Sequence, residues 1–149
     1  MSRLVRTYLL QTESEKREHG IAASASPRTL PARYRREVDD PALAYADCAV
    51  MIAEVGDRPV GVAVIRMGEG ESEIKRLWTD PSVRGRGVGR ALLDAALDTA
   101  AHRVRLSVWH WRAAAIGLYR SRGFVAVASW DDRDGVICMV RPADTLPLR

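Results

Sequence analysis

Residues 79–90, TDPSVRGRGVGR, decide the fold of this chain. Glycines stand at every second position, with arginines between and beside them: Arg84, Gly85, Arg86, Gly87, Gly89 and Arg90. Glycine adopts positive φ and lets a ligand approach the backbone, and the start of a helix presents unpaired N–H groups at its positive dipole end. A β-type run precedes this stretch and a Leu- and Ala-rich run follows it. We therefore predict a strand, a turn and a helix start that together bind a phosphorylated ligand.

The composition is that of a globular protein. The 149 residues suit one domain, and 47% of them are hydrophobic and 28% charged. No apolar run approaches the roughly 20 residues that span a bilayer, and the first residues lack the features of a secretory signal. We therefore expect a cytoplasmic protein without a membrane partner. A net charge of +4 is weak evidence for nucleic acid, which is also not expected as a partner.

The cysteines and histidines do not indicate a metal site. Cys48 and Cys138 form no CxxC motif, and the three histidines have no metal-like spacing. Each cysteine lies in an apolar, strand-like run, so we expect two buried free thiols.

The order of predicted elements indicates an α/β fold of the α+β type. Residues 2–19 look helical and end at Gly20, and residues 20–45 are less regular. The later elements are strands at 46–55, 60–67 and 73–79, a helix at 89–101, a strand at 104–108, a helix at 112–122, and strands at 124–130 and 136–141. Hairpins give antiparallel neighbours and strand–helix–strand crossovers give parallel ones. We expect a mixed, mostly antiparallel sheet of about six strands, with helices on both faces.

Two motifs in this order resemble the GNAT family of N-acetyltransferases, in particular its small bacterial type. Arg84, Gly87 and Gly89 match that family's acetyl-CoA-binding signature. Residues 115–124, AIGLYRSRGF, resemble the family's helix that ends in Tyr, three residues and Gly-Phe. The resemblance covers residues 46–141. It divides the single domain 1–149 into a helical acceptor-side segment, 1–45, and an acetyl-CoA-binding core, 46–141.

The resemblance implies acetyl-CoA as the cofactor. In the family, the strand before the glycine loop carries a bulge and splays from the next parallel strand, and pantetheine lies in the gap. The cofactor-binding residues implied in this way are Leu77, Trp78, Thr79, Arg84, Gly85, Arg86, Gly87, Val88, Gly89 and Arg90. Other phosphate loops fit less well, because the chain has no GxxxxGK[ST] and its glycines do not form GxGxxG.

Acetylation of an amine requires its neutral form. An amine with a pKa of ~10.4 is neutral in only about one molecule in 10³ at pH 7, so a base assists. The resemblance places this base at Glu73, which acts directly or through water; otherwise Glu73 binds the cation of the substrate or is merely exposed. Glu71 and His110 are alternative bases. Tyr119 matches the family's tyrosine, which protonates the departing thiolate.

The acceptor side is predicted from residues 30–34, LPARY, which resemble a Leu-Pro-Gly-x-Tyr loop of small bacterial relatives. This resemblance assigns substrate binding to Arg33 and Tyr34. Arg33, with Lys75 and Arg76, suggests an acceptor that bears a carboxylate, and surface charge is the alternative.

Other residues add to the acceptor side. Glu71 is a further candidate for substrate binding. Trp109 either lines the acceptor pocket or packs the end of its strand. Arg112 stands where many relatives carry Asn, which puts its contact with the cofactor in doubt.

These observations predict direct transfer of an acetyl group from acetyl-CoA to a primary amine of a small molecule or peptide. A catalytically silent acyl-CoA-binding or protein-interaction module of the same fold is the alternative. A homodimer is plausible in this family.

Overall fold

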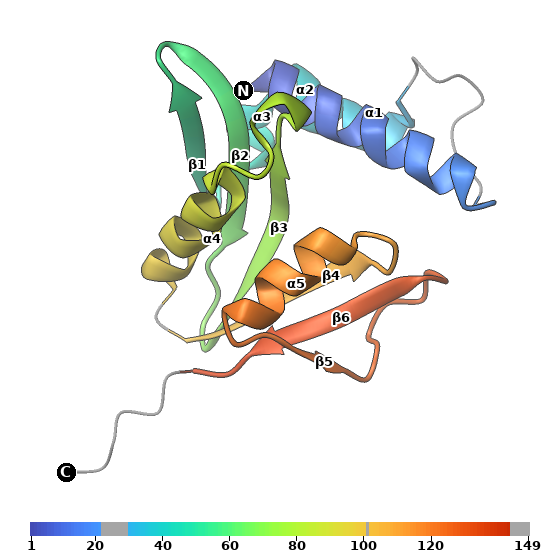
Figure 1. Ribbon diagram of the computed structural model, residues 1–149, viewed down its shortest axis with the longest axis vertical. Helices are drawn as coiled ribbons and strands as arrows, with labels where there is room; N and C mark the ends of the chain where they lie inside the picture. The colour runs from blue at the N-terminus through green and yellow to red at the C-terminus, as the bar shows by residue number, and fades with distance from the viewer. Residues whose placement is uncertain (22–29, 101, 144–149) are drawn as a thin grey trace.

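The computed structural model describes residues 1–21, 30–100 and 102–143 and contains a central sheet of six strands (Figure 1). The strands are β1 (Cys48–Val55), β2 (Arg58–Arg66), β3 (Glu71–Thr79), β4 (Arg103–Trp109), β5 (Val125–Val127) and β6 (Val136–Arg141). Their order across the sheet is β1-β2-β3-β4-β6-β5. The β3–β4 pair is parallel and the other pairs are antiparallel. The predicted mixed, mostly antiparallel sheet is thus confirmed.

The last hairpin is shorter on one side than predicted. We expected a strand over residues 124–130, whereas β5 ends at Val127. The hydroxyl of Ser129 donates to the backbone oxygen of Asp131 and accepts from the Asp131 N–H, a local turn of the chain beyond the end of β5.

Five α-helices and one short 3-10 helix are described: α1 (Ser2–Glu18), α2 (Ala32–Asp39), α3 (Pro41–Ala44), η1 (Pro81–Val83), α4 (Val88–Thr99) and α5 (Ala113–Ser121). Gly20, with φ of 73°, follows α1 as predicted. The segment expected to be less regular contains α2 and α3. Its prolines begin these helices, because Pro31 precedes α2 and Pro41 opens α3. We expected the α4 helix to extend to residue 101, which lies outside the described residues, whereas the helix ends at Thr99 and Ala100 has extended backbone.

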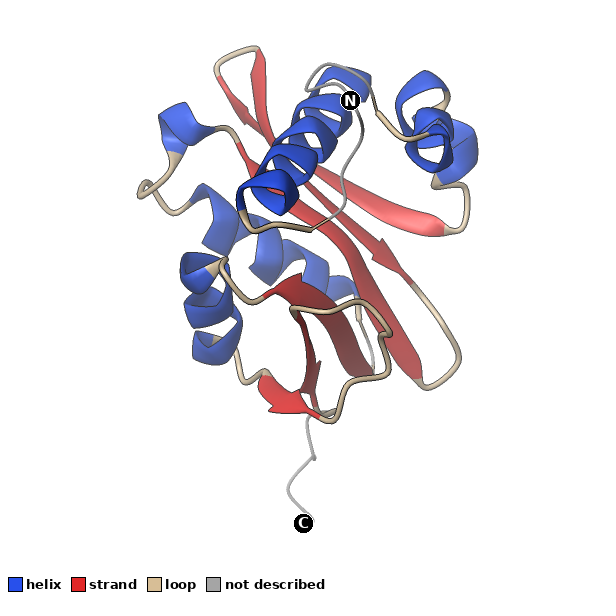
Figure 2. Ribbon diagram, turned by 90° about the vertical axis from the view of Figure 1, so that its right-hand side faces the viewer, coloured by secondary structure: helices blue, strands red, loops and turns tan. Residues whose placement is uncertain are grey.

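Helices cover both faces of the sheet (Figure 2). Strand β2 is buried on both sides, and its alternate residues belong to two separate cores. Ala63 and Ile65 pack with residues of α4 and α5, whereas Val62 and Val64 pack with Leu4 and other residues of α1. The alternation follows from the period of two in a strand. It confirms the expectation of helices on both faces.

The sheet opens between its two parallel strands. β3 and β4 pair at three positions, the last being Glu73↔Arg105, and no later pair forms among the described residues. Just beyond this point β3 carries a bulge, since Val64 lies opposite Arg76 and Ile65 lies opposite Ile74, so that Lys75 has no partner. A bulge increases the local twist and bends its strand. Figure 1 shows β3 and β4 running apart, which confirms the predicted splay.

Candidate active site

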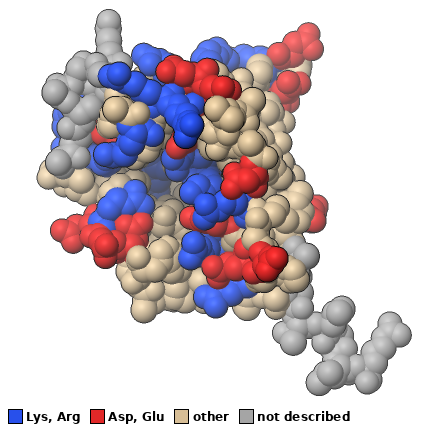
Figure 3. All heavy atoms as spheres, turned by 180° about the vertical axis from the view of Figure 1, so that it is seen from behind, with Lys and Arg blue, Asp and Glu red and all other residues tan. Residues whose placement is uncertain are grey.

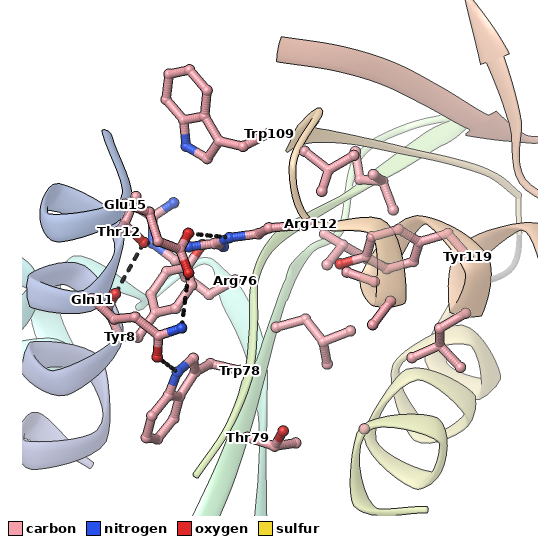
Figure 4. Close-up of a pocket in the computed structure, with 18 of the residues that line it drawn as sticks. Tyr8, Gln11, Thr12, Glu15, Arg76, Trp78, Thr79, Trp109, Arg112 and Tyr119 are labelled. Atoms are coloured by element: carbon pink, nitrogen blue, oxygen red, sulfur yellow. Dashed lines mark hydrogen bonds and ion pairs between the residues drawn. The ribbon is translucent and has the colours of Figure 1, made fainter. Parts of the chain in front are cut away.

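A cavity of about 600 Å³ lies where β3 and β4 separate. Residues 74–79 of β3 and residues 106–109 of β4 form two of its walls. The loop after β3 and the start of α4 close one end, and residues of α1 and α5 complete the lining (Figure 4). The opening of the sheet thus makes a cavity between two strands that would otherwise be paired.

The glycine loop presents a helix start to this cavity. Gly85 and Gly87 have φ of 79° and 81°, in the region that side chains rarely adopt. Gly87 is the N-cap of α4 and supplies no side-chain cap. The first N–H groups of α4 therefore have no partner within the helix, and Val88 and Gly89 line the cavity. This end of the cavity suits a phosphate group.

A second helix begins at the cavity wall. Arg112 is the N-cap of α5 and makes no side-chain cap, and the small residues at 113–115 line the cavity. The donors of two helix starts thus face one space, and their small side chains leave the backbone accessible.

A chain of hydrogen bonds crosses the opening through α1. Trp78 of β3 donates from Nε1 to Oε1 of Gln11 at 3.0 Å, and Gln11 donates from Nε2 to Oε1 of Glu15 at 2.9 Å. On the other side, Trp111 Nε1 and Arg112 Nε each donate to Oε2 of Glu15 at 2.9 Å. Figure 4 shows the part of this chain that runs from Trp78 through Gln11 and Glu15 to Arg112. It connects β3 to the loop after β4, so α1 bridges the two sides of the opening.

Glu15 is held as a carboxylate by these donors. Burial acts to raise its pKa, but the hydrogen bonds from Trp111 and Gln11 and the charge of Arg112 outweigh burial and lower the pKa. Glu15 is therefore ionised at neutral pH, and both its oxygens are engaged.

Tyr8 lies beside two guanidinium groups. Arg112 donates from Nη1 to the Tyr8 hydroxyl at 3.3 Å and from Nη2 to Thr12 Oγ1 at 2.7 Å. The guanidinium carbon of Arg76 lies 5.9 Å from the centre of the Tyr8 ring, and Arg76 is bound to Glu37 by two hydrogen bonds. Burial acts to raise the pKa of Tyr8, but the charges of Arg112 and Arg76 outweigh it, and the pKa of this phenol is lowered.

Tyr119 lies on the opposite wall of the cavity from Tyr8, and its pKa is shifted in the opposite direction. Its side chain is buried against Phe124, with ring centres 5.7 Å apart. Burial raises the pKa of the Tyr119 phenol, and the charge of Tyr8 raises it further. Its hydroxyl points into the cavity in Figure 4. Tyr119 is thus protonated at neutral pH, with its hydroxyl at the cavity.

The lining of the cavity is strongly cationic. One of the described lining residues is a glutamate, Glu15, and the cationic ones are Lys75, Arg76, Arg84, Arg90, Arg112 and Arg133. Figure 3 shows Lys and Arg side chains gathered around a hollow on the face seen from behind. This excess of positive charge favours anionic ligands.

Comparison with family models identifies the chain, because residues 12–124 match the model of the acetyltransferase (GNAT) family. The chain belongs to the GNAT family. This match includes α1 from Thr12 on, the glycine loop and α5, so it covers most of the cavity described above.

Individual GNAT relatives share a part of their length with the chain. The N-alpha-acetyltransferase RimI of Mycobacterium tuberculosis is 39% identical over 102 residues, which are 65% of this chain and 61% of that protein. A mycothiol acetyltransferase of Clavibacter michiganensis is 43% identical over 83 residues, or 50% of this chain and 26% of that protein. The chain therefore spans less than two thirds of the length of these curated relatives.

Solved GNAT structures show the same fold. An acetyltransferase of the GNAT family from Staphylococcus aureus aligns with a TM-score of 0.70 at 15% identity, over 93% of this chain and 90% of that chain. The PaiA N-acetyltransferase of Thermoplasma acidophilum, solved in complex with coenzyme A, aligns with a TM-score of 0.64 at 17% identity, over 95% of this chain and 89% of that chain.

Most site residues predicted from the GNAT resemblance line the cavity. They are Tyr34, Leu77, Trp78, Thr79, Arg84, Gly85, Gly87, Val88, Gly89, Arg90, Trp109 and Tyr119. Arg86 is exposed and is not among the lining residues. Trp109 stacks on Trp111 with ring centres 4.8 Å apart, so it packs the end of its strand and also lines the cavity.

The predicted glutamates lie at the closed end of the strand pair, outside the described lining. Glu73 forms ion pairs with Arg66 at 2.7 Å and with Arg105 at 3.7 Å. Glu71 lies 3.1 Å from Arg103 and 3.4 Å from Arg105. These residues are at the part of β3 that is still paired with β4, so their side chains serve as cross-strand ion pairs.

Arg33 and His110 are also outside the described lining. The Arg33 guanidinium lies over the ring of Tyr34 at 4.6 Å and 3.9 Å from Glu13, with 62% of its side chain exposed. His110 lies against the edge of Trp111, with ring centres 5.3 Å apart.

Sequence reasoning assigned residues 1–45 to the acceptor side but named none of the α1 residues that line the cavity. Tyr8, Gln11, Thr12 and Glu15 share one helix face, at spacings of three and four residues. The apolar stripe that starts at Leu4 thus becomes polar toward the end of the helix. A change from apolar to polar residues along one face of a packed helix is a sequence signal that this part of the helix faces a cavity.

Proposed function

We propose that the chain is an acetyl-CoA-dependent N-acetyltransferase that transfers the acetyl group directly to a primary amine of a small molecule or peptide. The observation that carries the proposal is a single cavity that joins an uncapped helix start, an opening between parallel strands and the buried Tyr119. Membership of the GNAT family supports acetyl-CoA as the donor. The donor supplies an acyl group activated as a thioester.

The donor side would bind acetyl-CoA mainly through the backbone. The N–H groups at the start of α4, from Val88 to Arg90, suit the pyrophosphate, and Arg84 and Arg90 add positive charge. Residues 77–79 have no pairing with β4. Their backbone groups are therefore accessible to the amides of pantetheine, and an N–H group here would polarise the thioester carbonyl.

The proton donor in this proposal is Tyr119. Its raised pKa keeps the phenol protonated, and its hydroxyl reaches the cavity to protonate the departing sulfur. Glu73 stays a hypothesis as the base, and from outside the described lining it would act through water.

The acceptor in this proposal bears a carboxylate as well as an amine. Arg76, Arg112 and Arg133 line the cavity together with Trp109 and Trp111. These guanidinium groups already pair with Glu37, Glu15 and Asp131, so an acceptor carboxylate would replace one of these partners to gain paired donors. The indole rings offer an apolar wall. This residue set differs from the one predicted from the sequence, in which Arg33 and Lys75 accompany Arg76.

A screen for thiol release with acetyl-CoA and a panel of amines tests the proposal. Each amino acid or short peptide in the panel is paired with its amide, which lacks the carboxylate. We expect turnover with members of the first set and a higher KM for the amides. Binding of coenzyme A without turnover of any amine would support the silent acyl-CoA-binding module instead, and no binding in calorimetry would refute both.

Tyr119→Phe separates an enzyme from a binding module. We expect kcat to fall by about 10² or more, the usual contribution of a positioned proton donor, while coenzyme A binds as before. Unchanged turnover would remove Tyr119 from the mechanism. The cytoplasmic location, the absence of a nucleic-acid partner and the homodimer remain predictions.

A further inference from the structure

We propose that Tyr8 is the group that takes the proton from the acceptor ammonium. This inference rests on the proposed N-acetyltransferase function and adds a catalytic residue that no feature of the sequence had indicated. It follows from the position of Tyr8 in the cavity and from the state of the other candidate bases.

The carboxylate of the described lining is already engaged. Glu15 accepts from Gln11 at one oxygen and from Trp111 and Arg112 at the other. A carboxylate that is stabilised by three donors is a weak base. Glu73 lies outside the described lining and is paired with Arg66 at 2.7 Å. Neither glutamate is therefore well placed to remove a proton inside the cavity.

Tyr8 is built to carry negative charge. Its hydroxyl accepts from Arg112 at 3.3 Å, and the guanidinium carbons of Arg112 and Arg76 lie 5.2 Å and 5.9 Å from its ring centre. Two cations near a phenol favour the phenolate. The lowered pKa of Tyr8 agrees with this geometry. A phenol with a lowered pKa is ionised in a larger fraction of molecules at neutral pH, and the phenolate is the form that can accept a proton.

The polar and charged groups around Tyr8 come from several elements of the fold. Thr12 and Glu15 belong to its own helix, and Arg76 comes from β3. Arg112 precedes α5, and the charge of Tyr8 is felt by Tyr119 on α5. Each guanidinium also pairs with a carboxylate, Arg112 with Glu15 and Arg76 with Glu37. These carboxylates weaken the effect of the two cations without cancelling it, since the net direction is a lowered pKa for Tyr8.

Tyr8 and Tyr119 thus form a pair of phenols with opposite tendencies in one cavity. The pKa of Tyr8 is lowered by two guanidinium groups, and that of Tyr119 is raised by burial. Environments that separate the pKa values of two groups mark them as base and acid. We therefore assign the base to the α1 wall and the acid to the α5 wall.

The proposed step is a single proton transfer. The Tyr8 phenolate forms an O–H bond as one N–H bond of the acceptor ammonium breaks, and the bonding pair stays on nitrogen as the nucleophilic lone pair. Arg112 keeps its hydrogen bond to the oxygen throughout, and Tyr8 afterwards releases the proton to solvent.

A direct test is the ultraviolet difference titration of the whole protein, which detects tyrosinate formation without any substrate. We expect one tyrosine to ionise below the ordinary range, and this transition should be missing in Tyr8→Phe. Arg112→Asn should move the transition to higher pH, because it removes a neighbouring cation. A low transition that persists in Tyr8→Phe, or the absence of any such transition in the wild type, overturns the proposal. Circular dichroism establishes that the variants are folded.

Kinetics provide the second readout. Tyr8→Phe should reduce kcat/KM by about 10² at neutral pH, with a smaller loss at pH values where the acceptor amine is already neutral, and should bind coenzyme A like the wild type. Glu73→Gln is the competing variant. If Glu73→Gln loses the pH dependence and Tyr8→Phe retains it, Tyr8 is not the base. Absence of turnover in the wild type would instead overturn the proposed function and this proposal with it.

Discussion

The glycine at position 87 allows a prediction with a matched control. Gly87 and Gly70 have φ of 81° and 80°, and a Cβ at either position would meet no atom within 4 Å. Alanine at either site therefore suffers the same conformational strain, about 1–2 kcal/mol. A chain of this length should lose about 2–4 °C in Tm for each kcal/mol. The two alanine variants should differ little in thermal unfolding, since open space surrounds both positions.

The ligand separates the two positions. Gly87 lines the cavity at the start of α4, whereas Gly70 is in the turn before β3. A glutamate at position 87 that lies about 5 Å from one phosphate charge costs about 3 kcal/mol at an effective dielectric constant of ~20. This energy corresponds to an affinity about a hundredfold weaker. Gly70→Glu adds the same side chain away from the cavity and should leave the affinity unchanged.

Isothermal titration calorimetry with coenzyme A measures this difference. The reasoning is refuted if Gly87→Glu binds coenzyme A within about threefold of the wild type while it is still folded. An equal loss of affinity in Gly70→Glu would also contradict it, since the effect would then be general rather than local.

Two further predictions concern stability. Phe124→Ala removes a side chain that is 1% exposed, which should cost about 3–5 kcal/mol in urea unfolding, whereas Val125→Ala on the exposed neighbour should cost at most about 1 kcal/mol. Equal costs would contradict the packing described for Phe124. Glu15 has a lowered pKa in the folded state, so its contribution is present above the pKa of the unfolded chain and is lost as the pH falls through the folded pKa. Between neutral pH and about pH 3, the free energy of unfolding should therefore fall less in Glu15→Gln than in the wild type. If it falls by the same amount in both proteins, Glu15 does not have this role.

The sequence predicted the elements whose signals are local. Alternate glycines followed by an apolar, helix-like run predicted a loop at Gly85 and Gly87. Both glycines have positive φ in the structure. The family resemblance implied the bulge in β3, which the structure places at Lys75. Prolines misled the prediction for α2 and α3, because Pro31 and Pro41 begin helices as well as interrupt them.

The contacts between distant segments could not be predicted in the same way. Arg112 reaches Glu15 and Tyr8 across about a hundred residues, and no local pattern marks such a pair. The family resemblance implied that Glu73 acts as a base. Its pairing with Arg66, however, depends on the register of β2 and β3. The positions of partners across a sheet are thus known only once the fold is known.

The hydrogen-bond chain from Trp78 through Gln11 and Glu15 to Arg112 constrains how the two sides of the cavity can change. The β3–β4 ladder is only three residue pairs long. Beyond it, the side chains of Gln11, Glu15 and Arg112 connect Trp78 of β3 to the far side of the cavity and so help to fix the distance between the two strands. In the proposed acetyltransferase, a substitution on α1 that suits a new acceptor would therefore also alter the space open to the thioester. Acceptor preference and donor geometry would then have to evolve together, although they belong to different segments of the chain.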